Sequence, residues 1–99
     1  MDGTCTYSAT KASSVGVATF TKTAINSVAA LQAATYQQPV SVSIAASTNY
    51  FQSYTTGVLT NATACGTAID HAVLTTGYGS LNGVNYFIVR NSWSASWGN

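Results

Sequence analysis

The chain has 99 residues, enough for one small domain but not for two. Hydrophobic residues make up 46% of it and charged residues only 5%, which excludes an intrinsically disordered chain. The three basic residues, Lys11, Lys22 and Arg90, are scattered, so no nucleic-acid or anionic membrane partner is expected. No run approaches the roughly 18 apolar residues of a membrane span. With one histidine and two acidic residues in the chain, we expect no metal site and no cofactor.

The N-terminal part of the chain predicts a strand and then a helix. After an irregular lead-in, Val15–Lys22 alternates apolar with small or polar residues, which indicates a strand with a bulge near its end. Thr21 or Thr23 can cap the helix that follows. That helix should end before Pro39, because proline disfavours helical backbone in the preceding residue. Its apolar stripe consists of Ala24, Val28 and Leu31, flanked by Ile25.

The rest of the chain predicts an antiparallel sheet. Val40–Ile44, Ala72–Tyr78 and Tyr86–Arg90 have the alternation or the apolar, aromatic content of strands. Leu81–Gly83 predicts a hairpin turn, since Asn-Gly supplies the positive φ angles that a tight turn needs. The fold class is therefore α+β, with one helix followed by an antiparallel sheet or partial barrel. We also expect a helical turn at Thr48–Tyr54, an extended piece at Gly57–Leu59, a bend at Gly77 and Gly79, and loops at Asn61–Gly66 and Ser92–Asn99.

His71 is the only histidine, and it stands at the start of a predicted strand, directly after Asp70. Hydrolysis needs a proton-transfer group that titrates near neutral pH, and histidine alone does so without perturbation. A single histidine at a strand start is nevertheless more often structural than catalytic. His71 is therefore a candidate general base and acid whose case depends on its neighbours.

Asn91 ends the second strand of the predicted hairpin, about as far from the turn as His71, so the two side chains can be cross-strand neighbours. An Asn carbonyl can accept from one imidazole N–H and leave the other nitrogen free, as in a nucleophile–base–orienter triad. Trp93 and Trp97 follow closely, and a Trp could shield such a bond from water. The alternatives are an ordinary turn asparagine and ordinary tryptophan packing.

Several ordered motifs together resemble the C-terminal region of papain-like, cathepsin L-like cysteine proteases, over essentially the whole chain. The motifs are Gly3-Thr4-Cys5-Thr6-Tyr7, Gln38-Pro39-Val40-Ser41-Val42, Phe51-Gln52-Ser53-Tyr54, Gly57-Val58-Leu59, Asp70-His71-Ala72, Gly77-Tyr78-Gly79, Tyr86 to Trp93, and Trp97-Gly98. The resemblance implies a papain-like fold, with residues 1–99 forming the C-terminal, β-barrel-like right half-domain, incomplete at both ends.

The resemblance also implies roles for individual residues. His71 corresponds to the histidine that pairs with a cysteine thiolate, and Asn91 to the asparagine that orients it. Trp93 corresponds to the shielding tryptophan, and Trp97 to the tryptophan on the leaving-group side.

The implied substrate is a peptide or protein. Ser43, Ile69 and Ala72 correspond to walls of the main specificity pocket, so an apolar substrate side chain is expected. Asp70 would offer backbone groups to the substrate strand. The implied activity is that of a cysteine endopeptidase.

The chain departs from the family pattern at the nucleophile. The family's Q-G-x-C-G-S-C-W motif, with the oxyanion-hole glutamine, is absent, and neither Cys5 nor Cys65 has that context. We expect the nucleophile in a missing N-terminal half of the same protein and no activity from residues 1–99 alone. The chain also stops before the family's closing strands, and Ser94 stands where the family usually has glycine.

The two cysteines bear on the cellular compartment expected for the protein. In the family both have partners in other segments, so Cys5 and Cys65 are expected as two half-cystines not bonded to each other. A lysosomal, vacuolar or secreted protein is implied, since disulfides persist in oxidising compartments. Asn61-Ala62-Thr63 is an N-glycosylation acceptor sequence, which fits that route. Any secretion signal would lie outside this chain, because the segment from Met1 to Cys5 has no signal-peptide character.

Two alternatives remain open. A truncated or degenerate protease domain could bind peptides or partners without catalysis. An unrelated β-domain binding module would leave the ordered motifs unexplained. In either case, unpaired strand edges predict aggregation or oligomers for the isolated chain.

Overall fold

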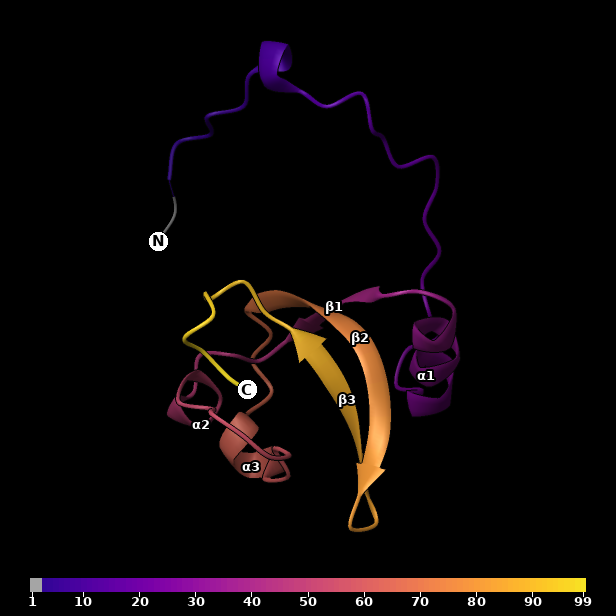
Figure 1. The fold of residues 1–99 in the computed structure, drawn as a ribbon, viewed down its shortest axis with the longest axis vertical. Helices are drawn as coiled ribbons and strands as arrows, with labels where there is room; N and C mark the ends of the chain where they lie inside the picture. Colours follow the sequence, from indigo (N-terminus) through magenta and orange to yellow (C-terminus); the bar gives the residue numbers. More distant parts are fainter. Residues whose placement is uncertain (1–2) are drawn as a thin grey trace.

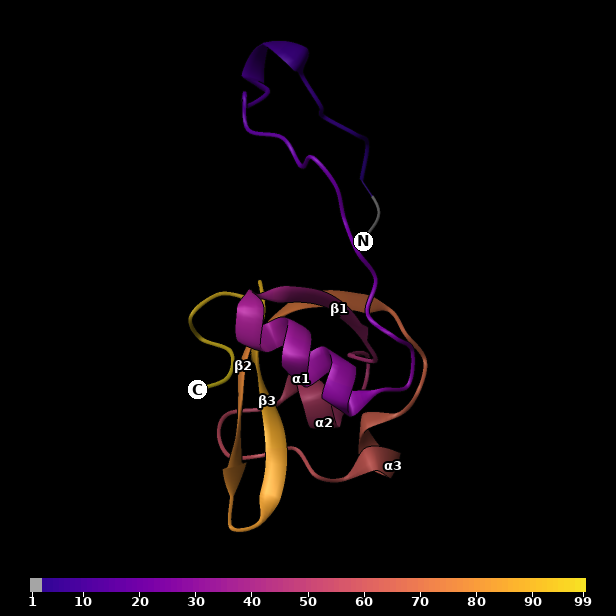
Figure 2. The same ribbon diagram turned by 90° about the vertical axis from the view of Figure 1, so that its right-hand side faces the viewer.

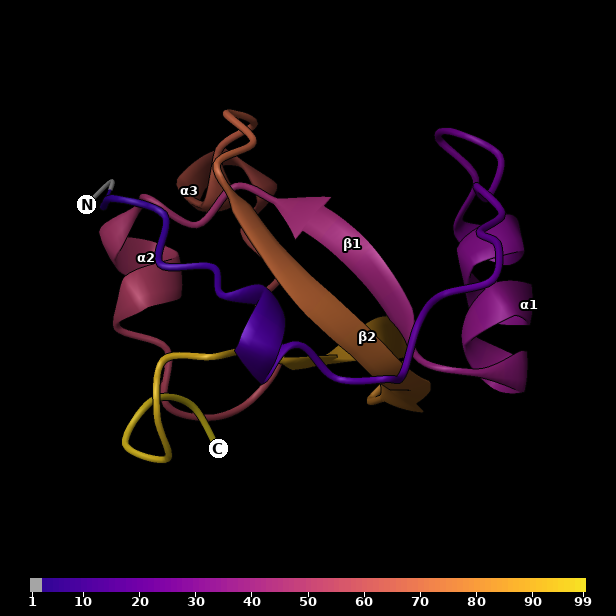
Figure 3. The same ribbon diagram turned by 90° about the horizontal axis from the view of Figure 1, so that it is seen from above.

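A computed structural model describes residues 3–99 and has an open antiparallel sheet with helices at both ends (Figure 1). The sheet has three strands in the order β1-β2-β3. Figures 1 and 3 draw α1 on one side of the sheet and the two short helices, α2 and α3, on the other. The predicted α+β class is confirmed, but the sheet is open rather than barrel-like.

The segment before the helix extends away from the sheet as an arch (Figures 1 and 2). It contains one 3-10 turn, η1 (Ala9–Lys11), and no strand, so the prediction of a strand over Val15–Lys22 is wrong for this structure. Val15 and Val17 are 85% and 87% exposed. Alternation supplies an apolar side to a strand but not the neighbouring strand that it needs, and none of the described residues pairs with this segment.

Helix α1 (Val28–Gln37) begins later than predicted. Neither Thr21 nor Thr23 caps it, because Asn26 has a φ of +52° and interrupts the helix there. Ser27 is the N-cap instead, and its Oγ accepts a hydrogen bond from the Ala30 amide at 3.1 Å. The C-terminal end before Pro39 is as predicted.

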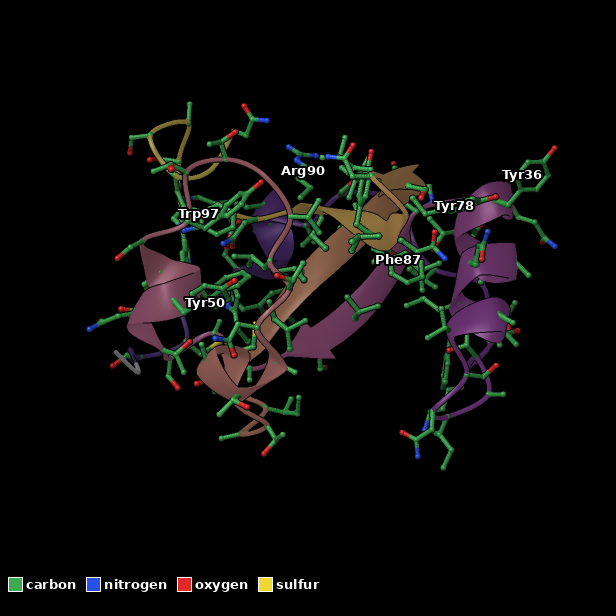
Figure 4. The ribbon with its side chains drawn as sticks, turned by 90° about the horizontal axis from the view of Figure 1, so that it is seen from below. Tyr36, Tyr50, Tyr78, Phe87, Arg90 and Trp97 are labelled. Carbon is green, nitrogen blue, oxygen red and sulfur yellow. The ribbon has the colours of Figure 1, made fainter. Side chains whose placement is uncertain are left out.

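The apolar stripe predicted for the helix is only partly buried: Leu31 is half-buried, but Ala24 lies before α1 and is exposed. Ile25 and Val28 are 89% and 69% exposed, whereas Thr35 is buried. The Oγ1 atoms of Thr35 and Thr75 lie 3.3 Å apart, and Thr75 Oγ1 donates to the Val40 carbonyl at 3.0 Å. A polar contact therefore connects the helix to the sheet. Tyr36 points outward from α1 in Figure 4, in agreement with its 81% exposure.

The three strands follow the prediction closely. β1 (Val40–Ile44) pairs with β2 (His71–Leu81), which pairs with β3 (Val84–Arg90), and both pairings are antiparallel. The β2–β3 turn places Asn82 and Gly83 at φ angles of +50° and +81°, as the Asn-Gly signal predicted.

Two short helices occupy the connection between β1 and β2. α2 (Asn49–Gln52) is the helical turn expected from the sequence. α3 (Ala62–Cys65) lies within Asn61–Gly66, where a loop was expected, because Asn61 caps it through its side chain. Gly57–Leu59 belongs to no strand. The buried apolar core of the described residues is small and consists of Ala46, Phe51 and Val73.

Candidate active site

One extra residue in β2 brings His71 and Asn91 to the same face of the sheet. Near the turn the register is Leu81↔Val84 through Gly77↔Ile88, and beyond Thr76 it becomes Thr75↔Val89 and Leu74↔Arg90. Extending this register by one residue sets Asn91 opposite Val73, on the face that His71 also occupies. Without the bulge, Asn91 would oppose Leu74 and point to the other face.

His71 and Asn91 are hydrogen-bonded, with His71 Nε2 and Asn91 Oδ1 at 2.8 Å. The predicted proximity of the two side chains is therefore confirmed. Asn91 Oδ1 also accepts from the Ser92 amide at 2.7 Å, and a backbone N–H can only donate, so the orientation of the Asn91 amide is fixed. Nε2 must then carry the hydrogen, which leaves Nδ1 as the basic nitrogen of a neutral His71 ring.

Trp93 stacks on the imidazole of His71, with ring centroids 4.9 Å apart and an interplanar angle of 29°. Trp93 packs edge-on against Phe51 of α2 at 5.6 Å and against Trp97 at 5.5 Å. The Asn91 amide nitrogen is buried without a partner among the described residues. The His71–Asn91 bond therefore lies beside an aromatic cluster that limits its access to water.

Trp97 connects the C-terminal loop to α2. Its indole Nε1 donates to the carbonyls of Phe51 and Gln52 at 3.3 and 3.1 Å, and Figure 4 draws it beside that helix. The Gly98 amide donates to the Tyr54 carbonyl at 3.2 Å. These bonds hold the loop that carries Trp93, so Trp97 supports the position of the stacked ring.

Asp70 fastens the start of β2 to the residues that follow β1. Its Oδ1 accepts from the buried Ala46 amide at 2.8 Å, and its own amide donates to the Ile44 carbonyl at 3.1 Å. The Ala46 amide, followed by the Ser47 hydroxyl, holds the pKa of the Asp70 carboxyl below its ordinary value, and the neighbouring His71 contributes in the same direction. Asp70 thus places a negative charge and a rigid backbone next to His71.

A shallow open depression surrounds the exposed side of His71. The side chains and backbone that line it are Ala46, Ser47, Gln52, Asp70, His71 and Trp93. Neither Ser47 nor Gln52 was predicted from the sequence as a site residue. Gln52, the last residue of α2, lies there because its Nε2 donates to the carbonyl of Ser47, just before that helix, at 3.3 Å. No sequence period signals this contact.

Two of the three residues predicted to line a substrate pocket, Ser43 and Ala72, lie on the face of the sheet opposite to that of His71. Ser43 and Ala72 are register partners, directly across from each other, and both are exposed. Ile69 precedes β2 and is 64% exposed. The structure therefore brings Ser43 and Ala72 together. Ala72 also lines an open depression over the three strands, which includes neither Ser43 nor Ile69.

Neither cysteine lies at this site. Both are free thiols in the structure; Cys5 belongs to the exposed N-terminal arch and Cys65 to α3. No sulfur lines the depression at His71. Among residues 3–99, no three His, Cys, Asp or Glu side chains gather as a group that could hold a metal ion. In the same range, no helix has both the length and the apolar character needed to cross a bilayer.

Comparison with known proteins shows to which family this chain belongs. The family model of papain family cysteine proteases matches residues 1–99. The chain belongs to the papain family of cysteine proteases. Within the family, it is 55% identical over 69 residues to germination-specific cysteine protease 1 of Arabidopsis thaliana, covering 70% of this chain and 18% of that protein. It is 43% identical over 98 residues to the oryzain beta chain of Oryza sativa subsp. japonica, covering 99% and 21%.

A solved structure agrees with the papain-like fold. The bromelain protease from Ananas comosus, determined in complex with an inhibitor, superposes with a TM-score of 0.63 at 43% identity. The match covers 70% of this chain and 31% of that one. The chain thus spans about a fifth of the length of the family members first compared with it, 18% and 21% for the two plant proteases above.

Proposed function

We propose that these residues form the His/Asn-bearing right half-domain of a cysteine endopeptidase, with His71 as general base and acid and Asn91 as its orienting residue. The observation that carries the proposal is the 2.8 Å bond from His71 Nε2 to Asn91 Oδ1 beneath a stacked Trp93. It leaves Nδ1 of the imidazole as the proton acceptor. The nucleophilic cysteine belongs, in this proposal, to a segment of the same protein outside residues 1–99.

Each step of peptide cleavage uses His71 Nδ1. The imidazole takes the thiol proton, and the thiolate attacks the carbonyl carbon of the scissile peptide bond. The imidazolium then returns its proton to the leaving amine, which departs and leaves a thioester. His71 next removes a proton from a water molecule that attacks the thioester and releases the free carboxylic acid, restoring the thiol.

Three groups neighbour the His71 ring throughout this cycle. Asn91 Oδ1 accepts its Nε2–H, the face of Trp93 lies against it, and the Asp70 carboxylate is adjacent in sequence. Because Asn91 is held by the Ser92 amide and Trp93 by the aromatic cluster, these groups are in place before the substrate binds.

The proposed substrate is a peptide or protein with an apolar side chain near the cleavage point. Ser43, Ala72 and Ile69 supply small or apolar surface, and Asp70 supplies backbone groups for an extended peptide. Trp97 is assigned to the leaving-group side. The compartment proposed for the complete protein is a vacuole, a lysosome or the exterior, where disulfides form.

The test compares the complete protein with residues 1–99 alone, using a fluorogenic peptide and a cysteine-directed inhibitor. We expect inhibitable turnover by the complete protein and a loss of at least about a hundredfold in His71→Ala, whereas exposed Asn85→Ala serves as a matched surface control. Inhibitable turnover by residues 1–99 alone would refute the placement of the nucleophile elsewhere.

A second candidate is a non-catalytic peptide- or partner-binding domain. It rests on the exposed pair Ser43 and Ala72, which would contact a bound peptide without any nucleophile. Mass spectrometry after treatment of the complete protein with the cysteine-directed inhibitor separates the two. A single adduct on a cysteine outside residues 1–99 supports the peptidase, and an unmodified protein supports the binding domain.

A further inference from the structure

The acceptor sequence Asn61-Ala62-Thr63 lies where an oligosaccharide can be attached without disturbing the fold. All three residues are exposed, and the middle one is not proline. Asn61 is the N-cap residue directly before α3, which lies at the margin of the molecule in Figures 1 and 2. None of the three lines the depression at His71.

The two polar atoms of the Asn61 amide have separate functions in the structure. Oδ1 accepts a hydrogen bond from the Ala64 amide at 3.0 Å and so caps α3. N-glycosylation forms its bond at Nδ2 and leaves the carbonyl oxygen able to accept. We propose that Asn61 is an N-glycosylation site whose side chain continues to cap α3 after the sugar is attached.

The backbone at Thr60 and Asn61 is also held in a defined position. The Tyr50 hydroxyl of α2 accepts from the backbone amides of Thr60 and Asn61 at 3.3 and 3.4 Å, and Figure 4 draws Tyr50 between the two short helices. The first sugar would therefore leave the surface from a fixed point. A hydrophilic glycan there would cover part of a chain with only 5% charged residues and so favour its solubility.

The modification needs one co-reactant, an oligosaccharide activated as a lipid-linked diphosphate. The Asn61 amide nitrogen attacks the anomeric carbon of the first sugar, a C–N bond forms, and the bond from that carbon to the phosphate oxygen breaks. The lipid diphosphate leaves with the bonding electrons, and one Nδ2 proton passes to a base. Nothing is oxidised or reduced. The Thr63 hydroxyl is the part of the acceptor sequence that the transferase requires.

The experiment expresses the complete protein in eukaryotic cells behind a supplied secretion signal, so its outcome does not depend on the proposed natural compartment or on peptidase activity. We expect the peptide that contains Asn61 to carry one core oligosaccharide, removable by peptide N-glycosidase with conversion of the attachment residue to aspartate. Absence of any glycosylated Asn61 peptide from the secreted or retained protein overturns the proposal.

Matched variants separate the sugar from the helix cap. Thr63→Ser keeps the acceptor sequence and should keep the modification, whereas Thr63→Ala should remove it and leave the Asn61–Ala64 bond untouched. Asn61→Asp should lose the glycan but retain a capping oxygen. Equal glycan occupancy in Thr63→Ala and the unaltered protein would contradict enzymatic N-glycosylation at this site.

Discussion

His71 and Asn91 meet in a 2.8 Å hydrogen bond although they lie on strands whose register changes by one residue before reaching them. The bond depends on the bulge in β2, because the same two strands in an unbroken register would put the two side chains on opposite faces of the sheet. A local backbone feature several residues away thus determines whether His71 and Asn91 can touch.

Deleting Val89 of β3 should separate the pair without removing either residue. With the bulge kept, Asn91 would oppose Leu74 on the other face of the sheet, and the hydrogen bond to His71 would be lost. We expect the complete protein to lose peptidase activity by about the same factor as Asn91→Ala, with its circular dichroism spectrum retained. Deleting Thr76 is the matched control, because it removes the extra residue of the bulge and leaves the other cross-strand pairs as they are. Full activity in the first deletion variant would show that the register does not set the pair.

Much of this site was accessible from the sequence. The Asn-Gly turn and the lengths of the two strands predicted that His71 and Asn91 would be near each other, and the structure confirms it. The bulge was anticipated only as a bend at Gly77 and Gly79, because an extra unpaired residue has no period of its own. A register counted from the turn without the bulge would have put Asn91 on the face of the sheet opposite to His71.

The errors in the fold have a common physical cause. Two segments show the expected local period but are not buried as predicted. No described strand pairs with Val15–Lys22. In the helical stripe of Ala24, Val28 and Leu31, Val28 remains exposed. Periodicity records which side of an element is apolar, and burial requires a partner that lies elsewhere in the molecule. The cap at Ser27 was missed because Asn26 interrupts the helix through its left-handed backbone.

Asn91→Ala should lower kcat/KM of the complete protein between about ten- and a hundredfold. A hydrogen bond to a group that becomes charged contributes about 1.5–3 kcal/mol, and each 1.36 kcal/mol corresponds to a factor of ten in rate. Steady-state kinetics with a fluorogenic peptide measures the effect, with Asn85→Ala on the exposed part of β3 as control. A loss confined to KM would indicate that Asn91 acts in substrate binding rather than in positioning His71.

Ser94→Gly should stabilise the C-terminal loop. Ser94 has a φ of +74°, a left-handed conformation that costs a residue with a Cβ atom about 1–2 kcal/mol and costs glycine almost nothing. Two contacts of its hydroxyl with Ser96, at 2.8 and 3.3 Å, and the greater entropy of unfolded glycine oppose the gain. We therefore expect the free energy of unfolding to rise by about 0.5–1 kcal/mol in urea denaturation of the complete protein.

Ser96→Gly is the matched control for the loop. Ser96 does not adopt a positive φ, so glycine at this position relieves no strain and removes the same hydroxyl contact from its other side. The free energy of unfolding should stay the same or fall. If both variants stabilise the loop equally, backbone strain at Ser94 is not the cause.

The contribution of Asp70 to stability should depend on pH in one direction. The Ala46 amide, then the Ser47 hydroxyl, keep the pKa of the folded-state carboxyl below its ordinary value of 3.8. A lowered folded-state pKa means that the stabilisation is fully present above the unfolded pKa and is lost as pH falls through the folded one. The Asp70→Asn variant keeps an acceptor oxygen but has no charge at this position. At pH 6 the unaltered complete protein should therefore have a higher free energy of unfolding than the variant.

Urea denaturation of both proteins at a series of pH values checks this expectation. The difference between them should be constant well above pH 3.8 and should shrink as the carboxyl protonates below that value. Asp70→Ala, which also leaves the buried Ala46 amide without its partner, should be less stable than Asp70→Asn at every pH, because an unsatisfied buried donor is costly whether or not a charge is present. The difference in unfolding free energy between the unaltered protein and Asp70→Asn could instead persist unchanged into strong acid. That result would mean that the charge of Asp70 does not stabilise the junction between β1 and β2.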